Sequence, residues 1–221
     1  MSKSRINDLG NWAVIDIETT GIDPGRDEII DVGFLQFEGT KLIRKYSSLV
    51  RTEQKLSKFI TKLTNITDEM VSGAPTLELV EDDIGELYGH HLIAHNASFE
   101  ESFLAPIFDH LEDGEERESY QDSIPFLGLL FLNQSSLSLE NLINHLRIAD
   151  HEVHRGYEDS RDLLKVLLLA CFILSKDREA YQSMRLLFAT YNLNQYFYAK
   201  FLFLTRDELF EIAEQIDFNL D

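Results

Sequence analysis

Two carboxylates within an apolar strand constrain this chain more than any other feature of its sequence. Residues 12–18 alternate with the period of two that is typical of a β-strand, and Asp16 and Glu18 stand near its end. Residues two apart on a strand project from one face, so both acids lie on one side and Ile15 and Ile17 on the other. Acids on the core side are costly to bury unless something neutralises them, and a hard divalent cation is the usual solution.

A pair of acids alone more often belongs to an exposed strand whose carboxylates face solvent. In this chain the pair stands in the segment DIETTG, residues 16–21, directly after an apolar run. Gly21 allows the backbone to turn tightly beside the carboxylates. This context favours a functional site over an exposed strand.

A second acid stands at the start of a predicted helix. The segment HNASFE, residues 95–100, follows a short apolar strand, and Ser98 is expected to cap the helix that follows. Glu100 then lies in the first turn and points back toward the strand ends. Taken alone, Glu100 is simply an acid that favours a helix N-terminus.

A histidine and a further aspartate occur in the segment HRGYED, residues 154–159. Five helical steps would separate His154 and Asp159 by about 140° around the axis, so the two cannot share one helical face. We therefore expect His154 on the loop that enters a helix, Gly156 at the bend and Asp159 in the first turn. Either His154 or Asp159 alone would be unremarkable.

The order of elements predicts an α/β fold with a mixed sheet flanked by helices, because strands come first, two strand–helix crossovers follow and the remainder is helical. Thr205 is an expected N-cap, with Glu208 in a capping box, and Ser138 or Leu139 precedes the apolar face of an earlier helix. Strands are expected at 12–18, 28–37, 41–50, 91–95 and 119–123, with a hairpin turn at 38–40 and an acidic loop at 112–118. Helices are expected at 68–71, 76–88, 98–111, 124–132, 139–146, 157–174, 178–191, 195–204 and 207–216.

The net charge argues against one class of function, the binding of long duplex nucleic acid through its phosphates. The chain has 20 basic and 39 acidic residues, a net charge of −19. The charge is uneven, because residues 1–65 hold 10 basic and 9 acidic residues, whereas 66–221 hold 10 and 30. Seven basic residues between 41 and 62 face a single acid, Glu53, and fit a solvated strand edge as well as a rim for a phosphate backbone. They are Lys41, Arg44, Lys45, Arg51, Lys55, Lys58 and Lys62.

Targeting signals are missing from the sequence. The first twelve residues lack the apolar segment of a signal peptide, and no apolar run reaches the roughly 18 residues that cross a bilayer. The single cysteine, Cys171, lies in an apolar run and cannot form an internal disulfide, which favours a reducing compartment. We therefore expect a cytoplasmic protein with no membrane contact.

In this order and form, the three motifs resemble those of the DEDDh exonucleases, the DnaQ-like branch of the ribonuclease-H-like fold. The resemblance runs from about Trp12 to Cys171, and includes Leu63 to Met70 and Tyr120 to Ser123. It implies a ribonuclease-H-like mixed sheet flanked by helices, with residues 1–174 as the exonuclease domain. Residues 175–221 lie outside it, and we expect a helical C-terminal extension that packs on the domain or docks a partner.

The resemblance also implies roles for individual residues. Asp16, Glu18 and Asp159 would bind two divalent metal ions, Glu100 would support the second ion, and His154 would be the general base. Two such ions about 3.5–4 Å apart can hold a scissile phosphate between them. Phe99 fits the core as well as a substrate contact. The residues implied in contacts to the terminal nucleotide are Thr19, Thr20, Gly21, Leu63, Asn96 and Phe99.

Two positions depart from the family pattern. Glu100 stands where the family has aspartate, and its extra methylene moves the carboxylate by roughly 1.5 Å. Because Mg²⁺ demands near-octahedral geometry, the Glu100 side chain must bend back, act through water or favour Mn²⁺. Asn65 stands where the family often has glycine, a mild change because asparagine tolerates left-handed backbone.

The expected function is a 3′→5′ exonuclease that releases nucleoside 5′-monophosphates, with single-stranded or frayed DNA as the favoured substrate. RNA or short oligoribonucleotides are an alternative, since an acidic protein that holds few phosphates can still process them. A catalytically weak module that binds nucleic acid or a partner protein is a second alternative, motivated by Glu100 and the net charge. A polymerase or helicase is the expected partner or fusion.

Overall fold

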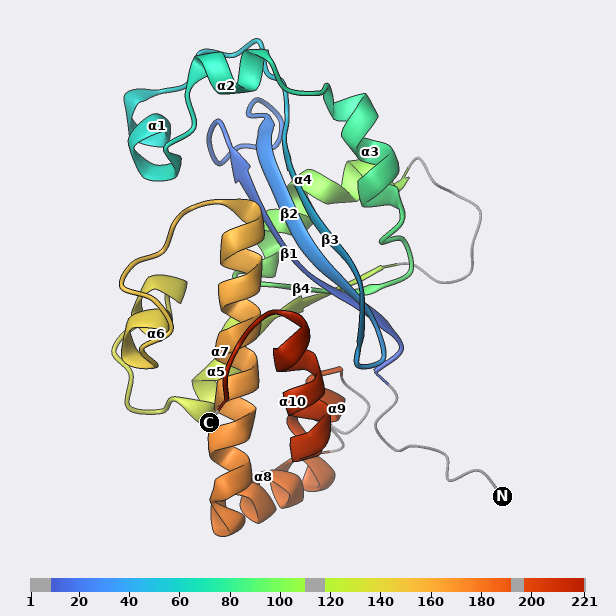
Figure 1. Ribbon diagram of the computed structural model, residues 1–221, viewed down its shortest axis with the longest axis vertical. Coiled ribbons are helices and arrows are strands. Elements are labelled where there is room, and N and C mark those ends of the chain that lie inside the picture. The colour runs from blue at the N-terminus through green and yellow to red at the C-terminus, as the bar shows by residue number, and fades with distance from the viewer. Residues whose placement is uncertain (1–8, 110–117, 192–196, 221) are drawn as a thin grey trace.

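The computed structural model describes residues 9–109, 118–191 and 197–220, and within them a five-stranded mixed sheet is flanked by helices (Figure 1). The strand order is β3-β2-β1-β4-β5. The strands are β1 (Asn11–Thr19), β2 (Ile29–Glu38), β3 (Lys41–Leu49), β4 (His91–Ala94) and β5 (Ser119–Asp122). The first three form antiparallel neighbours, whereas β1, β4 and β5 run parallel.

The central strand β1 divides the apolar core into two layers. Trp12 and Val14 belong to one cluster of buried residues, and Ile15 and Ile17 belong to another. This alternation confirms the two-faced strand that the sequence predicts, because successive side chains of a strand point to opposite faces. Asp16 and Glu18 therefore extend the face that carries Trp12 and Val14.

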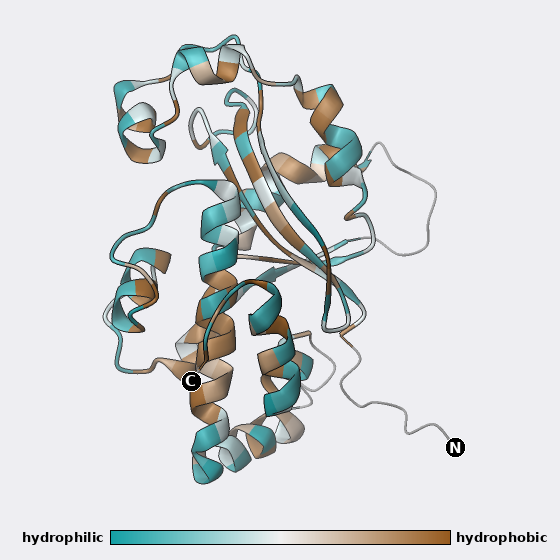
Figure 2. Ribbon diagram, in the orientation of Figure 1, coloured by the Kyte–Doolittle hydropathy of each residue, from teal (hydrophilic) through white to brown (hydrophobic). Residues whose placement is uncertain are grey.

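The Trp12 face of the sheet is covered by the long helix α7, whose residues share one buried cluster with Trp12 and Val14. Figure 2 shows brown, hydrophobic residues on the parts of α7 that lie against its neighbours and teal ones toward its ends. The helices that contribute to this cluster are α5 (Ser123–Leu130), α6 (Leu139–His145), α7 (Gly156–Lys176), α8 (Arg178–Thr190), α9 (Phe197–Leu202) and α10 (Arg206–Gln215).

The opposite face of the sheet is covered by α3 (Leu77–Gly85) and α4 (Ala97–Asp109), which pack on Ile15 and Ile17. Two short helices, α1 (Lys58–Thr64) and α2 (Asp68–Ser72), form a smaller cluster around Ile60 against Ile30 of β2. In Figure 1 they lie beyond the end of the sheet at which β1 terminates.

Several local predictions are confirmed. Thr205 and Glu208 form the capping box of α10, and Ser138, one of two residues considered at the start of α6, is its cap. Gly39, at the β2–β3 turn, and Asn65, which ends α1, both have positive φ, of 59° and 57°. Other predictions are wrong. Helix α1 was not expected, and Ser98 lies inside α4, one residue after its start at Ala97, so it is not the cap.

Some expectations fall partly on residues outside the described ranges. The acidic loop at 112–118, the end of the helix expected at 98–111 and the start of the one expected at 195–204 lie there. Among the described residues, α9 begins at Phe197. No helix in the described ranges combines the length and the apolar character that a membrane crossing requires.

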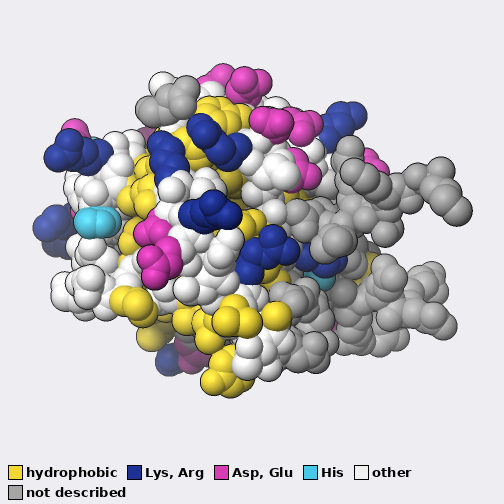
Figure 3. All heavy atoms as spheres, turned by 90° about the horizontal axis from the view of Figure 1, so that it is seen from below, with side chains coloured by type: hydrophobic (Ala, Val, Ile, Leu, Met, Phe, Trp, Pro, Cys, Tyr) yellow, Lys and Arg dark blue, Asp and Glu magenta, His cyan; other side chains and the backbone are white. Residues whose placement is uncertain are grey.

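The C-terminal helices share the core of the domain. Phe201 of α9 packs edge-on against Trp12, with ring centroids 5.7 Å apart, and Phe210 of α10 packs against Phe172 of α7. Hydrophobic and basic side chains lie next to one another on this end of the molecule, which Figure 3 shows from below. A groove of about 560 Å³ opens between α5, α7 and α8, lined mainly by apolar side chains such as Leu132 and Ile173.

Candidate active site

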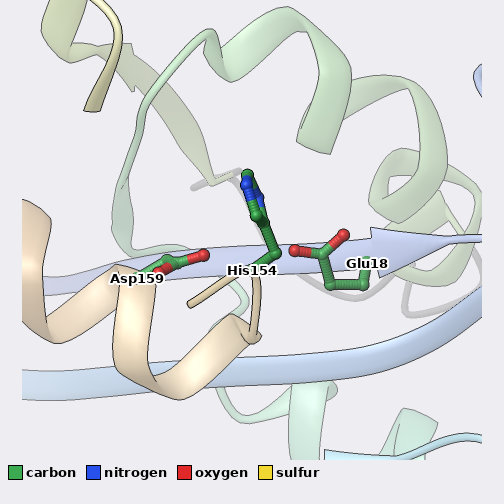
Figure 4. Close-up of side chains that lie close together, drawn as sticks. All are labelled: Glu18, His154 and Asp159. Carbon is green, nitrogen blue, oxygen red and sulfur yellow. The ribbon is translucent and has the colours of Figure 1, made fainter. Parts of the chain in front are cut away.

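Three side chains from distant parts of the sequence meet at the end of β1. Oxygen atoms of Glu18 and Asp159 and a ring nitrogen of His154 all lie within 4.8 Å of one another. Figure 4 shows Glu18 on the strand, Asp159 on the first turn of α7 and His154 on the loop between them in space. The placement of His154 on the loop and of Asp159 in the first turn agrees with the sequence prediction, whereas Gly156, expected at the bend, is the first residue of α7.

The loop that presents His154 has unusual backbone geometry. His154 has a φ of 56°, in the left-handed region that few residues other than glycine adopt. Arg155 is extended and precedes the helix, and Asp159 accepts a hydrogen bond of 3.1 Å from the backbone N–H of Arg155. The carboxylate of Asp159 thus stabilises the start of its own helix, as an acid in the first turn does.

Helix α7 begins in backbone contact with the sheet. A Cβ atom added to Gly156 would lie 2.5 Å from the backbone nitrogen of Gly33 and 2.7 Å from the carbonyl oxygen of Asp16. The hydroxyl of Ser160, one turn later, donates a hydrogen bond of 3.0 Å to the carbonyl of Gly33. This close approach fixes the position of Asp159 relative to Asp16.

A buried ion pair anchors the same loop to β2. The Nε of Arg155 and the backbone N–H of Gly156 both donate to Oδ2 of Asp31, at 2.7 and 3.2 Å. Asp31 pairs with Glu18 across the two strands and is 1% exposed. Burial raises the pKa of Asp31, and the guanidinium of Arg155 opposes that rise.

Glu100 approaches the cluster from α4. It lies in the first turn, as the sequence predicts, and is 2% exposed. Its Oε2 atom is buried without a hydrogen-bond partner among the described residues. Asp16 lies close enough to Glu100, Glu18 and Asp159 for their charges to raise its pKa. The two acids that complete the predicted set of four therefore lie beside the three residues of Figure 4.

Burial raises the pKa values of these acids, and repulsion between neighbouring carboxylates adds to the rise for Asp16 and Glu18. Burial raises the pKa of Glu18 to about 8, with a further contribution from the charge of Asp159. Burial likewise raises the pKa of Glu100 to about 8 and that of Asp159 to about 7. The pKa of Asp16 is raised well above its usual range by burial and by Glu100. Carboxylates crowded in this way ionise together only when cations neutralise them.

The cluster fits divalent cations. Carboxylate oxygens are the ligands that Mg²⁺ and Mn²⁺ prefer, and an Oε2 of Glu100 and an Oδ1 of Asp159 are buried without hydrogen-bond partners among the described residues. Unpaired buried oxygens are costly, and a metal ion would satisfy them. The acidic group is thus a candidate metal site.

The segment after β1 is held by its own hydrogen bonds. The hydroxyl of Thr19 donates to the carbonyl of Gly21, and the hydroxyl of Thr20 accepts from the backbone N–H of Glu28 at 3.0 Å. A Cβ atom on Gly21 would meet the carboxylate of Asp27, which would have to move to make room for it. These three predicted substrate contacts therefore lie in a tightly built turn directly beside Glu18.

The other predicted contact residues differ in exposure. Asn96 is exposed and has a φ of 75°, and Leu63 on α1 is half-buried. Phe99 is also half-buried and packs on Phe103, with ring centroids 5.1 Å apart, so it contributes to the core. Arg44 of the basic stretch is already paired with Asp83 of α3 and with Glu86, the C-cap of that helix. The remaining six basic residues, Lys41, Lys45, Arg51, Lys55, Lys58 and Lys62, are exposed.

Sequence reasoning missed four residues that shape the site. Gly33 and Asp31 both interrupt the apolar run of β2, and an isolated glycine or acid in such a strand is a signal of close backbone contact or of a buried partner. Arg155 could have been found as the partner of that acid only with the fold known. No local signal marks Glu152, whose charge also raises the pKa of Asp159.

Residues 13–167 match the model of the family described as RNase_T: Exonuclease. The DNA polymerase III PolC-type of Thermotoga maritima is 29% identical over 158 residues, which are 71% of this chain and 12% of that protein. The 3'-5' exonuclease DinG of Staphylococcus epidermidis is 31% identical over 163 residues, which are 73% of this chain and 18% of that protein. The chain thus spans less than a fifth of the length of these relatives.

Solved structures of low sequence identity share the fold. E. coli exonuclease I in complex with a dA16 oligonucleotide has a TM-score of 0.60 at 14% identity, over 72% of this chain and 40% of that chain. A 3'-exonuclease that recognises the 3'-end of a histone mRNA stem-loop has a TM-score of 0.54 at 20% identity, over 71% of this chain and 61% of that chain. The mixed sheet and its helices are thus the ribonuclease-H-like fold that the motifs imply.

Proposed function

Because the chain belongs to the exonuclease family whose model spans residues 13–167, we propose that it removes nucleotides one at a time from the 3′ ends of nucleic acid. The products are nucleoside 5′-monophosphates, and single-stranded or frayed DNA is the favoured substrate. The observation that carries this proposal is the convergence of Glu18, His154 and Asp159 within 4.8 Å at the end of β1.

The acidic cluster is proposed to hold two divalent cations, Mg²⁺ or Mn²⁺. Asp16, Glu18 and Asp159 would be the ligands, and Glu100 would support the second ion. When bound, the ions would neutralise the carboxylates and stabilise the charge that develops on the scissile phosphate. The raised pKa values of Glu18 and Asp159 support this assignment, since burial and neighbouring carboxylates disfavour their charged forms and cations would relieve that cost.

His154 is proposed to take the proton of the attacking water. Imidazole suits proton transfer near neutral pH, and the side chain is 31% exposed, so water reaches it. Its loop is held by Arg155 and Gly156 on Asp31, which limits the movement of the base. Positioning of this kind contributes to rate because the reacting groups need no further ordering.

The proposed substrate is a nucleic-acid 3′ end that only a few residues of the protein contact. The net charge of −19 opposes binding of long duplex, whereas Lys58 and Lys62 of α1 are exposed and can meet a short stretch of phosphates. We assign the terminal nucleotide to the turn after β1 and its surroundings. The proposed contacts are Thr19, Thr20, Gly21, Leu63, Asn96 and Phe99.

The proposed setting is a larger assembly. The relatives are named for a DNA polymerase and for the exonuclease DinG, and the matched region is a small part of each. We propose that this chain acts beside or fused to a polymerase or helicase in the cytoplasm. The described helices of residues 175–221 pack on the core of the domain, and their outer surface would be available for docking that partner.

A digestion series tests the activity. A single-stranded DNA labelled at its 5′ end should shorten stepwise with Mg²⁺ or Mn²⁺ and release mononucleotides, and a 3′ label should be lost first. The same oligonucleotide in RNA tests the substrate preference, with slower shortening expected. Asp16→Asn, which removes a charge from the cluster at nearly constant volume, should be inactive. An absence of mononucleotides with both metals and both substrates would contradict the proposal.

A second candidate is a module that binds nucleic acid with little turnover. It is favoured by Glu100, whose longer side chain stands where the family pattern has aspartate. This reading expects unchanged binding of a fluorescent single strand in wild type and Asp16→Asn, with no cleavage in either protein. If the wild-type protein cleaves the strand and Asp16→Asn does not, the result supports the exonuclease over the binding module.

A further inference from the structure

Glu152 is a fifth carboxylate beside the acidic cluster, and the proposed function gives it no role. It precedes His154 by two residues, and its Oε1 lies 3.6 Å from Nδ1 of the imidazole. The side chains of Glu152 and His154 are 18% and 31% exposed, so the contact is partly shielded from solvent. Its charge also acts on Asp16, Glu18 and Asp159, whose pKa values it helps to raise.

The second oxygen of Glu152 is fixed by α6. Oε2 accepts a hydrogen bond of 3.1 Å from the backbone N–H of Glu140, and Oε2 of Glu140 accepts one of 2.6 Å from the backbone N–H of Glu152. This reciprocal pair ties the loop to the first turn of α6 and orients the carboxylate. Oε1 of Glu152 is then directed toward His154.

The loop is therefore held on both sides of the histidine. Glu152 is tied to Glu140, and Arg155 and Gly156 are tied to Asp31. His154 lies between these anchors with a φ of 56°. A residue other than glycine keeps such backbone geometry only where its surroundings determine it, and such residues concentrate at functional sites.

We propose that Glu152 is a positioning residue, which holds Nδ1 of His154 so that Nε2 faces the acidic cluster as the proton acceptor. The inference rests on the proposed function, in which His154 is the base. A distance of 3.6 Å is longer than a hydrogen bond, and catalytic contacts of this kind often shorten once substrate is bound. A carboxylate that accepts from Nδ1–H fixes the tautomer in which Nε2 is free to take a proton.

Two other roles for Glu152 lead to different results. As a further metal ligand, it would change the metal concentration at half-maximal rate when altered. As a purely structural tie to α6, it would act independently of His154. The Glu152→Gln variant separates these roles, because glutamine has one acceptor oxygen and cannot accept from both Glu140 and His154.

The first experiment measures kcat, KM and the metal dependence of single-strand digestion. Glu152→Gln should lower kcat about 10- to 100-fold, by analogy with the loss of a carboxylate that orients a metal-ligating histidine. KM and the metal midpoint should stay within about twofold. In a His154→Ala background the same change should have no further effect, because residues that act through one another are not additive. A shifted metal midpoint, or an equal loss in that background, overturns the proposal.

A matched control removes the same charge nearby. Asp150 is exposed and lies on the same loop, two residues before Glu152. Asp150→Asn should keep kcat within about twofold of wild type. If Asp150→Asn lowers kcat as much as Glu152→Gln does, the loss results from the change in net charge, and the positioning role of Glu152 is overturned.

The second experiment does not depend on activity. Nitrogen NMR of the metal-free protein, at a pH where the imidazole is neutral, should show His154 as the Nδ1–H tautomer in wild type. Glu152→Gln should shift it toward Nε2–H, while the exposed His151 stays unchanged. An unchanged His154 tautomer contradicts the inference. A shifted tautomer in a protein that cleaves nothing contradicts only the proposed function.

Discussion

Gly33 and Gly156 approach so closely that neither has space for a side chain. A Cβ atom on Gly33 would collide with the backbone of Gly156 and Tyr157, so α7 begins directly on β2. Since Asp159 is in the first turn of α7, the two glycines set the distance between its carboxylate and those of β1. The geometry of the acidic cluster therefore depends on two residues that carry no functional group.

Gly156→Ala should push α7 away from the sheet. We expect a loss of about 1–3 kcal/mol in the free energy of unfolding, as for other overpacked interiors, and a fall in activity as Asp159 moves. Urea denaturation and the digestion assay measure the two effects. Gly128→Ala on α5 is the control, because its Cβ would make an ordinary contact of 3.4 Å with Leu137. A fully active and stable Gly156→Ala would show that the contact is dispensable.

His154→Ala should abolish most turnover and leave metal binding intact. The loss of a general base typically lowers the rate by about 10²- to 10⁴-fold. Initial rates and a calorimetric titration with Mn²⁺ measure the two properties. His151→Ala, which alters an exposed histidine of the same loop, should behave as wild type. Near-normal turnover in His154→Ala would remove the base assignment.

Glu100→Asp should lower activity in Mg²⁺. Glu100 is 2% exposed, so its longer side chain is packed in place, and the aspartate carboxylate would withdraw by roughly 1.5 Å. A displacement of that size costs about 10- to 100-fold in rate. Rates in Mg²⁺ and Mn²⁺ should be compared with those of Glu101→Asp, an exposed neighbour. Higher activity of Glu100→Asp in Mg²⁺ would contradict this expectation and mean that glutamate supports Mg²⁺-dependent activity less well than aspartate at this position.

The metal-free protein should lose stability as the pH rises from about 5 to about 8. The pKa values of Glu18 and Glu100 are raised to about 8 and that of Asp159 to about 7, so the folded protein binds protons that the unfolded chain has released. Stability is then fully present below the ordinary carboxyl pKa and is lost as the pH passes the raised values. Thermal unfolding in a chelator should show this decline.

Divalent cations should reverse that decline. Mg²⁺ or Mn²⁺ binds the ionised carboxylates and should raise the melting temperature more at pH 8 than at pH 5. The double variant Asp16→Asn, Glu18→Gln should give a flatter curve in chelator and a smaller response to metal. If melting temperature depends on pH in the same way in the double variant and in wild type, the acidic cluster is not the cause of the pH dependence.

The ion pair between Arg155 and Asp31 should matter more than an exposed pair. Arg155→Ala leaves the carboxylate of Asp31 buried without its charged partner, and we expect a loss of about 1–3 kcal/mol in stability. Arg26→Ala breaks the exposed pair with Asp23 and should cost less than about 1 kcal/mol. Urea denaturation of both variants makes the comparison. Equal losses would contradict the anchoring role of Arg155.

The sequence predicts those parts of the site that depend on local rules. The two-residue period places Asp16 and Glu18 on one face of β1, and the rotation of a helix separates His154 from Asp159. It does not predict contacts between segments. Gly33 and Gly156 are 123 positions apart in the sequence, and only the packing of α7 on β2 brings them together. Glu152 was missed for the same reason, since its partner Glu140 lies on another element.

Helix α1 shows a different limit. Its residues, 58–64, include two lysines and two threonines and lack the long apolar repeat by which helices are recognised. Ser57 and Asn65 cap its two ends, and Ile60 packs on Ile30. Tertiary packing and caps, rather than periodicity, therefore stabilise this helix.

The cluster at the end of β1 draws its members from three stretches of chain that the ribosome makes at different times. A growing chain that has emerged only through α4 contains Asp16, Glu18 and Glu100 but has neither His154 nor Asp159. Because α7 must dock on β2 before Asp159 reaches the other acids, a chain that has emerged only through α4 lacks the complete acidic cluster. The order of synthesis thus places completion of the acidic cluster after α7 has been made.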